Sequence, residues 1–289
     1  MKEQKQSLYF IHIAVLFFGL AGLFGKIIDQ PAIIITLGRV VFATFGLGLF
    51  FLFTKNGFRI SSFKNGFVLI LAGVILAFHW WAFFYAIQRS TVAIGLLTFS
   101  TFPVFTVFLE PLFFREKIIL KNIYIALLTF FGIYLIVPEF NVDNTFFVGA
   151  FWGMMSGFSF SVLQLLNRFL VKSASGIQVT FYEVLISSVV LFPFLFIEKV
   201  EMSSSDLLFL FLLGTVFTAM AHSLFIHGLK KVNVFVSSII ASLEPVYGIL
   251  FAILLLAEIP DLKTIIGGLI IVASNFLVMF FRKFYAADE

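Results

Sequence analysis

The sequence predicts an all-α, polytopic membrane protein in which ten transmembrane helices form two inverted five-helix repeats. Three observations support this fold class. Of the 289 residues, 61% are hydrophobic and only 12% are charged, whereas a soluble domain carries about 25% charged residues. The apolar residues form blocks of roughly 20 residues, long enough to cross a hydrocarbon core about 30 Å thick. One stretch of the chain also has a second, diverged copy later in the sequence.

Ten apolar blocks follow one another, separated by short polar connections. Backbone in lipid must satisfy its own hydrogen bonds, so each block is expected to be a helix. The first block is long for a signal peptide and lacks a clear cleavage site, so we expect it to be retained. The predicted spans are Leu8–Ile28, Pro31–Thr54, Gly66–Gln88, Thr91–Phe114, Leu120–Val137, Phe146–Leu170, Ile177–Ile197, Leu207–Leu229, Val232–Ala257 and Leu262–Phe281.

Basic residues in the connections predict the orientation of the spans. Of the 19 Lys and Arg residues, fourteen lie at the two termini or in connections on the termini's side of the membrane. Four lie on the other side, namely Lys26, Arg89, Lys199 and Lys263, and Arg39 lies within a span. Cytoplasmic loops carry the excess of Lys and Arg. We therefore expect a multi-pass protein of the cell (inner) membrane with both termini in the cytoplasm.

The duplicated stretch links the fourth predicted span to the ninth. Residues 90–121 align without a gap to residues 232–263, which places Pro103 opposite Pro245 and Glu116 opposite Glu258. Each half then contains five spans, and an odd number makes the second half enter the membrane from the opposite side. Inverted repeats of this kind are typical of secondary transporters.

The order of these motifs resembles the drug/metabolite transporter superfamily, EamA type. The resemblance rests on Arg39, Tyr85-Ala86-Ile87, the 91–95 stretch, Phe102-Pro103-Val104 and Glu116 in the first half, and on Gly228-Leu229, Glu244-Pro245-Val246 and Glu258 in the second. It implies two EamA-like five-helix repeats, at residues 8–137 and 146–281. It also implies a metabolite carrier whose central cavity is lined by spans one, three, four, six, eight and nine.

Glu244 is the first candidate for substrate binding or coupling. It lies midway along the ninth span, directly before Pro245, and a charge at that depth is costly enough to be a functional candidate. Proline removes a helical hydrogen bond, so Pro245 and its counterpart Pro103 are predicted structural hinges. Glu244 could exchange a proton or bind a substrate amine. The alternative is a structural hydrogen bond to a neighbouring helix, since Phe102 takes this place in the first copy.

Further polar and aromatic residues within spans complete the candidate set. Arg39 could clamp a carboxylate or phosphate or reach toward the interface. Glu183 takes the repeat-related place and could pair with Arg39 or form a separate gate. His79, Trp80 and Tyr85 in the third span could line a pocket for an aromatic or cationic ligand, or form a packing layer. His222 stands opposite Trp80 in the second copy.

The remaining patterns narrow the function classes. The chain has no Cys, no P-loop and no metal-ligand spacing, so we expect no cofactor, no metal site, no nucleic-acid partner and no enzymatic activity. The predicted function is export of small polar metabolites, such as amino acids, by alternating access, with protons as the candidate coupling ion. The alternatives are an exchanger or facilitator of nucleotide sugars, phosphorylated metabolites or organic cations, and a membrane-embedded enzyme acting on a lipid-linked substrate.

Overall fold

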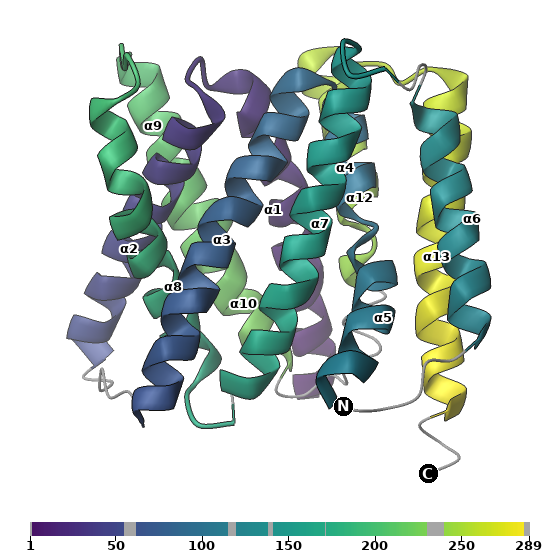
Figure 1. Cartoon of the computed structure of the whole chain (residues 1–289). Helices are drawn as coiled ribbons and strands as arrows, with labels where there is room; N and C mark the ends of the chain where they lie inside the picture. The colour runs from purple at the N-terminus through teal and green to yellow at the C-terminus, as the bar shows by residue number, and fades with distance from the viewer. Residues whose placement is uncertain are drawn as a thin grey trace.

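The computed structural model is all-helical, and it describes residues 2–54, 62–114, 120–137, 141–170, 172–229 and 240–285. The helices run roughly parallel to one another, and α1 begins at the same end of the molecule at which α13 ends (Figure 1). Their bounds are α1 Lys2–Ile27, α2 Ala32–Thr54, α3 Phe63–Arg89, α4 Val92–Phe99, α5 Phe102–Phe114, α6 Leu120–Ile136, α7 Thr145–Leu170, α8 Gly176–Leu191, η1 Phe192–Phe196, α9 Ser204–Gly214, η2 Thr215–Met220, α10 Ala221–Leu229, α12 Glu244–Leu256 and α13 Leu262–Tyr285.

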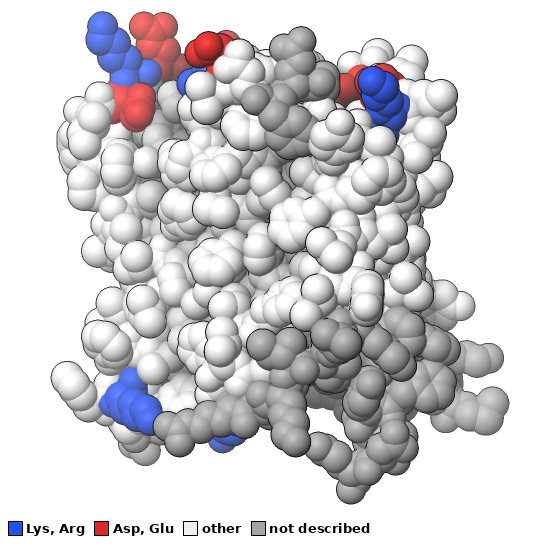
Figure 2. Space-filling model, turned by 45° about the vertical axis from the view of Figure 1, so that its right-hand side comes forward, with Lys and Arg blue, Asp and Glu red and all other residues white. Residues whose placement is uncertain are grey.

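These elements confirm the predicted fold class. Seven described helices are long and apolar enough to span a membrane, and three shorter apolar helices cover Ile123–Ile136, Glu244–Leu256 and Leu262–Leu277. On the face shown in Figure 2, described Lys, Arg, Asp and Glu residues gather at the upper end and Lys and Arg residues at the lower end, with an uncharged band between them. Many large apolar side chains are exposed, Phe45, Phe67 and Phe130 among them, as expected for a surface that faces lipid. The chain is a multi-pass membrane protein.

The fourth span is two helices rather than one. Helix α4 ends at Phe99 and α5 begins at Phe102. The hydroxyls of Ser100 and Thr101 turn back to the carbonyls of Leu97 and Thr98, at 2.8 and 2.7 Å. Such bonds compete with the helical ladder. Proline is favoured in the first turn of a helix, so Pro103 starts the second segment instead of bending a continuous one.

The ninth span has the same construction in its described part. Leu243 is the N-cap of α12 and Pro245 occupies its first turn, so Glu244 is the first residue of a half-helix that begins inside the membrane. The predicted start of this span, residues 232–239, lies outside the described residues. Both prolines therefore mark the start of a half-helix, two or three residues after the break in the span.

The two halves run in opposite directions, as inverted repeats require. The backbone amide of Val92, at the start of α4, donates to Glu258 Oε1, just beyond the end of α12, at 2.6 Å. The fourth span thus begins where the ninth ends. Equivalent positions also meet across the halves, because Thr44 Oγ1 and Ser188 Oγ lie 3.2 Å apart and 144 residues apart in sequence.

Helix packing repeats this symmetry at two glycines. A Cβ on Gly73 would lie 3.1 Å from the carbonyl of Glu183, and a Cβ on Gly214 would lie 2.7 Å from that of Arg39. The two glycines are 141 residues apart, whereas Trp80 and His222 beyond them are 142 apart. The extra residue falls in the π-helical turn η2, and single-turn π-bulges accommodate such insertions.

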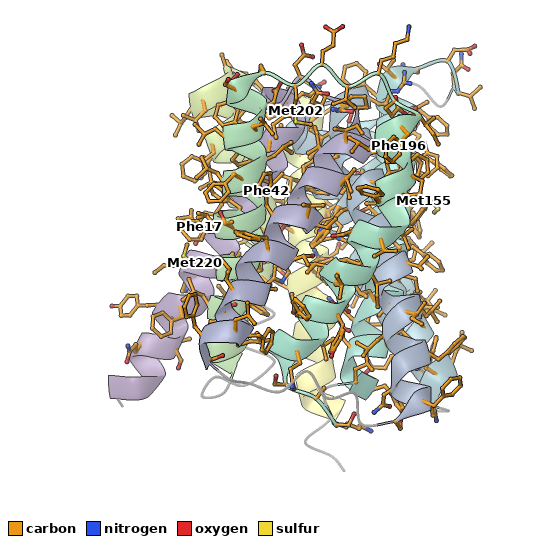
Figure 3. All side chains as sticks on the ribbon, turned by 90° about the vertical axis from the view of Figure 1, so that its left-hand side faces the viewer. Phe17, Phe42, Met155, Phe196, Met202 and Met220 are labelled. Carbon is orange, nitrogen blue, oxygen red and sulfur yellow. The ribbon has the colours of Figure 1, made fainter. Side chains whose placement is uncertain are left out.

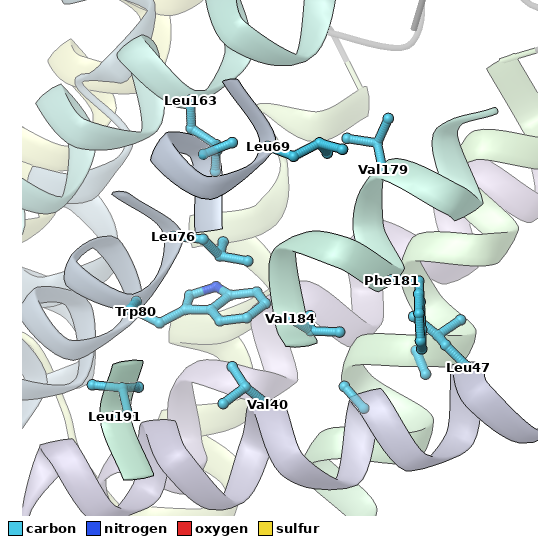
Figure 4. Close-up of a cluster of buried hydrophobic side chains, with 14 of the residues drawn as sticks. Val40, Leu47, Leu69, Leu76, Trp80, Leu163, Val179, Phe181, Val184 and Leu191 are labelled. Atoms are coloured by element: carbon cyan, nitrogen blue, oxygen red, sulfur yellow. The ribbon is translucent and has the colours of Figure 1, made fainter. Parts of the chain in front are cut away.

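Aromatic side chains fill the seams between the two halves. Phe17 of α1 contacts Phe217 of η2 at a centroid distance of 5.4 Å, and Phe42 of α2 contacts Phe211 of α9 at 5.6 Å (Figure 3). A second apolar cluster joins α2, α3, α7 and α8 around Val40, Leu76 and Val184 (Figure 4). These contacts hold the first half against the second around the polar site.

Candidate functional site

Arg39 of α2 is the buried cation of the site. Its side chain is only 4% exposed. The guanidinium carbon lies 4.0 Å from the ring centroid of Trp80 on α3, within the range of a cation–π interaction. Its Nε donates to Thr218 Oγ1 at 2.8 Å. The same Thr218 hydroxyl donates to the carbonyl of Leu213 at 2.7 Å, so the π-helical turn η2 fixes the acceptor that orients Arg39.

Glu244 is the acid of the site. It is the first residue of α12, where the helix dipole favours a negative charge. Its charge interacts with that of Arg39, and its side chain is partly accessible. Helix α1 approaches closely here, because a Cβ on Gly19 would lie 2.8 Å from the carbonyl of Glu244. Glycine at position 19 lets α1 pack directly against the break in the ninth span.

His79 of α3 is held from α7. Its Nδ1 lies 3.0 Å from the carbonyl oxygen and 2.8 Å from the hydroxyl of Ser156, and that hydroxyl also contacts the His79 carbonyl at 3.0 Å. A ring that donates from Nδ1 keeps the lone pair on Nε2 when neutral. The imidazole stacks on Phe160 at a centroid distance of 5.0 Å.

His222 of α10 completes the group from the second half. Its ring lies 6.2 Å from Trp80 in a T-shaped contact and 4.8 Å from Phe18 of α1. Arg39 acts electrostatically on both His79 and His222. The structure thus brings together Arg39, His79, Trp80, His222 and Glu244. They come from spans two, three, eight and nine, while spans one, four and six supply aromatic and Ser156 contacts.

Both charged groups of this cluster keep polar atoms that lack a hydrogen-bond partner among the described residues. The two terminal nitrogens of Arg39 make no hydrogen bond to any described residue, and neither does the carboxyl of Glu244. In the described part of the chain, the fully enclosed side-chain polar atoms without a partner belong to Asn167, Glu183 and Asn275. With no hydrogen-bond partner among the described residues, these atoms of Arg39 and Glu244 are suited to bind a ligand that is not part of the chain.

Two predicted site residues lie elsewhere. Tyr85 stacks on Trp81 at 5.6 Å and meets Trp152 of α7 at 5.8 Å, with Arg89 over its ring at 4.9 Å. Trp80 and Trp81 face different neighbours, as a 100° step on a helix requires. Glu183 of α8 hydrogen-bonds Asn167 of α7, and no described contact joins it to Arg39.

The site is asymmetric between the repeats. Phe102, the first-copy counterpart of Glu244, packs against Phe99 and Phe160 at ring distances of 5.5 and 5.0 Å. The predicted hinges Pro103 and Pro245 stand in equivalent places, but only the second break carries a charge. Glu258, which sequence analysis kept out of the site, accepts the Val92 amide as a helix cap. Its counterpart Glu116 lies outside the described residues.

Sequence reasoning missed Thr218 and Ser156, which position Arg39 and His79. Hydroxyl residues are common in membrane helices, where they bond their own backbone, so neither residue carries a signal of its own. The one-residue difference in spacing between Gly73–Trp80 and Gly214–His222 does mark the insertion around Thr218. This insertion can be recognised in the sequence only after the structure shows that Gly73 and Gly214 make equivalent contacts.

Comparison with known proteins identifies the family. Residues 6–137 and 147–280 each match the EamA-like transporter family. The chain is similar to the uncharacterized transporter YxxF of Bacillus subtilis, with 22% identity over 98% of this chain and 92% of that protein. It is also similar to the S-adenosylmethionine uptake transporter of Rickettsia conorii, with 25% identity over 79% and 76%. A solved crystal structure matches with a TM-score of 0.66 and 16% identity over 96% of this chain and 97% of that one, which shows the fold.

Proposed function

This chain belongs to the EamA-like transporter family, and we propose that it is a secondary carrier of zwitterionic amino-acid-type metabolites. The observation that carries the proposal is a pair of opposite charges, Arg39 and Glu244. They interact across the site and keep polar atoms without a hydrogen-bond partner among the described residues. In this binding mode Arg39 takes the carboxylate through its planar fork, and Glu244 takes the ammonium group. Trp80 lies against the guanidinium and keeps it in place.

Two further observations agree with this substrate class. The Rickettsia relatives are named for uptake of S-adenosylmethionine, a compound with an α-amino-acid end. The site also lies at the start of a half-helix in a broken span, which is where transporters of this architecture place substrate and ion sites. The described part of the site contains a single Arg among aromatic rings, which favours one carboxylate over a multiply charged phosphate ester.

Alternating access requires a gate that opens at each end in turn. At the end opposite the termini, Lys26 Nζ donates to the carbonyl of Ser90 at 2.7 Å and interacts with the charge of Glu258. Gln30 Nε2 donates to the carbonyl of Glu201 at 2.8 Å. These contacts tie α1 and the α1–α2 connection to the segments that precede the fourth and eighth spans and follow the ninth, and in the proposed cycle they form the gate at this end. The mode we propose is export from the cytoplasm, with both termini cytoplasmic, in exchange for protons.

The test is counterflow in proteoliposomes with amino acids and S-adenosylmethionine. Each labelled substrate is compared with two analogues, one lacking the carboxylate and one lacking the amine. We expect only compounds that carry both groups to be exchanged by the wild-type protein. Arg39→Gln and Glu244→Gln should each lose exchange, because each leaves one substrate charge without a partner. Asp143→Asn, at an exposed acid in the connection between α6 and α7, is the matched control.

Two outcomes contradict the proposal. Equal exchange of an analogue that lacks one charged group would show that Arg39 and Glu244 do not act as a pair on the substrate. Normal exchange by Glu244→Gln at every pH would remove Glu244 from both substrate binding and coupling.

A further inference from the structure

A second buried acid, Glu183, lies apart from the Arg39 site. It is 4% exposed and accepts a hydrogen bond from the side chain of Asn167. Its other oxygen, Oε1, is fully enclosed and has no hydrogen-bond partner, and the same is true of Asn167 Oδ1. An enclosed polar atom without a partner is rare and calls for an explanation. Here two such atoms belong to two side chains that already contact each other.

A single proton on Glu183 would give both of these oxygens a hydrogen-bond partner. An ionised carboxylate only accepts hydrogen bonds, whereas a protonated one carries an O–H donor. If Oε1 of Glu183 carries the proton, it can donate to Asn167 Oδ1 while the Asn167 amide donates to the other carboxyl oxygen. A carboxylic acid and a primary amide then form a two-bond ring. Without the proton, both oxygens are enclosed acceptors that lack a donor.

Among the described residues, only Asn167 is a partner for a negative charge on Glu183. Leu163 and Leu170 flank Asn167 along α7, and Val179 and Val184 flank Glu183 along α8, all within the apolar cluster shown in Figure 4. No charge of a described residue acts on Glu183. The described titratable groups within the helices around α8 are Arg39 on α2, Lys64, His79, Tyr85 and Arg89 on α3, Tyr182 on α8 itself and His222 on α10. Arg89 lies over the ring of Tyr85 at 4.9 Å.

Each charged or ring group in that set has its own contacts. Lys64 lies over the ring of Phe169 at 5.1 Å, and Arg39, His79 and His222 belong to the site described above. A buried charge that lacks a partner is strongly disfavoured in protein and in lipid. Deprotonation of Glu183 therefore demands a change in its surroundings.

That change would reach both halves. Helix α8 belongs to the second half and packs closely on α3 of the first, because Ser187 Oγ donates to the carbonyls of both Gly73 and Glu183, at 2.7 and 2.8 Å. On α2, Thr44 meets Ser188 one residue further along α8. A charge that appears on Glu183 is therefore placed where the two halves must move against each other during transport.

We propose that Glu183 and Asn167 form a proton-binding site, separate from the substrate site, that couples proton movement to the rearrangement of the halves. The bound form carries the proton on Glu183 Oε1 and shares it with Asn167 Oδ1. The released form opens the α3–α8 contact so that water can solvate the carboxylate. The coupling role rests on the proposed transport function, whereas the proton site itself does not.

Infrared spectroscopy of the reconstituted protein tests the site without any transport. A protonated carboxyl gives a carbonyl band that shifts in D2O and is absent from a carboxylate. We expect the wild-type protein to show this band at neutral pH, Glu183→Gln to lose it and Glu244→Gln to retain it. Asn167→Leu should shift the frequency of this carbonyl band. Gln at position 183 can form an amide–amide ring with Asn167, so this variant preserves the packing. Retention of the band in Glu183→Gln overturns the proposal.

Coupling is then measured in vesicles with an imposed pH gradient. In Glu183→Gln the accumulation ratio of a counterflow substrate should fall to that of gradient-free vesicles. Undiminished gradient-driven accumulation in this variant overturns the coupling role. If the band behaves as expected but no amino-acid-type compound is exchanged by the wild-type protein, the substrate proposal fails while the proton site is supported.

Discussion

Substitution of Gly214 by alanine tests the packing that positions Arg39. Gly214 is the last residue of α9 and faces α2. A Cβ at this position would lie 2.5 Å from Phe42 Cβ, 2.7 Å from the carbonyl oxygen of Arg39 and 2.9 Å from the amide of Ala43. Two of these three atoms belong to the backbone, so no side-chain rotation can relieve the overlap. Helix α2 must move away from the π-helical turn.

The expected cost follows from two opposing terms. Overpacking a close contact costs about 1–3 kcal/mol, and replacing a helical glycine by alanine returns about 0.5–1 kcal/mol. We therefore expect a net loss in the free energy of unfolding of about 1 kcal/mol, the centre of the range of roughly 0–2.5 kcal/mol that the difference between these two terms gives. The same displacement stretches the 2.8 Å bond from Arg39 Nε to Thr218, so the apparent affinity for substrate should fall as well.

Thermal unfolding in detergent and the KM for counterflow measure the two effects. Gly46→Ala is the matched control, because its nearest neighbours would lie at 3.7 and 3.8 Å, which is ordinary contact. Gly73→Ala, at the equivalent position of the first half, meets Ile186 Cβ at 2.6 Å, an atom that no rotamer change can move, and should also be destabilising. The reasoning is refuted if Gly214→Ala is as stable as Gly46→Ala.

Three other changes test separate parts of the structure. Arg39→Lys keeps the charge but loses the planar fork, so the KM for an amino-acid substrate should rise about tenfold or more, corresponding to about 1.4 kcal/mol of lost binding; an unchanged KM would contradict carboxylate binding at Arg39. Glu258→Ala removes the acceptor of the Val92 amide and should lower stability by about 1 kcal/mol, whereas Glu258→Gln, which keeps an acceptor oxygen, should stay near wild type in the same thermal assay. Hydrogen bonds from the side chain and the backbone amide of Thr264 hold the pKa of Asp261 below its ordinary value, so its contribution to stability is present above the pKa of the unfolded chain and is lost as the pH falls through the lower folded value; Asp261→Asn should flatten the fall of the unfolding temperature in acid, and an unchanged slope would contradict it.

The fold was predictable from the sequence because lipid imposes simple rules on length and polarity. The Leu120–Val137 and Phe146–Leu170 predictions agree with α6 and α7 to within one residue at each end. The internal breaks were harder to predict. Their position depends on hydroxyls such as those of Ser100 and Thr101, which bond the backbone only after the local turn has formed. The π-helical turn depends on one extra residue in one copy.

The site was predictable only in part, for a physical reason. A buried charge is rare in a span, so Arg39 and Glu244 could be selected from composition alone. Which charges meet depends on helix rotation and on close approach at small residues. Glu183 is as buried as Arg39 and occupies its repeat-related place, yet it contacts Asn167. Tyr85 shares a helix with Trp80 and faces a different neighbour.

Divergence between the copies explains how a symmetric fold acquires a directional site. Where equivalent residues meet across the halves they are still compatible, as with the hydroxyls of Thr44 and Ser188, and such a contact can be kept while the halves rock. At two pairs of equivalent positions the copies differ in charge: Arg39 against Glu183, and Phe102 against Glu244. Arg39 comes from the first half and Glu244 from the second. In the proposed binding mode a zwitterion held between them would join the halves through its own two charges, so its binding and release would favour different arrangements of the halves, as alternating access requires.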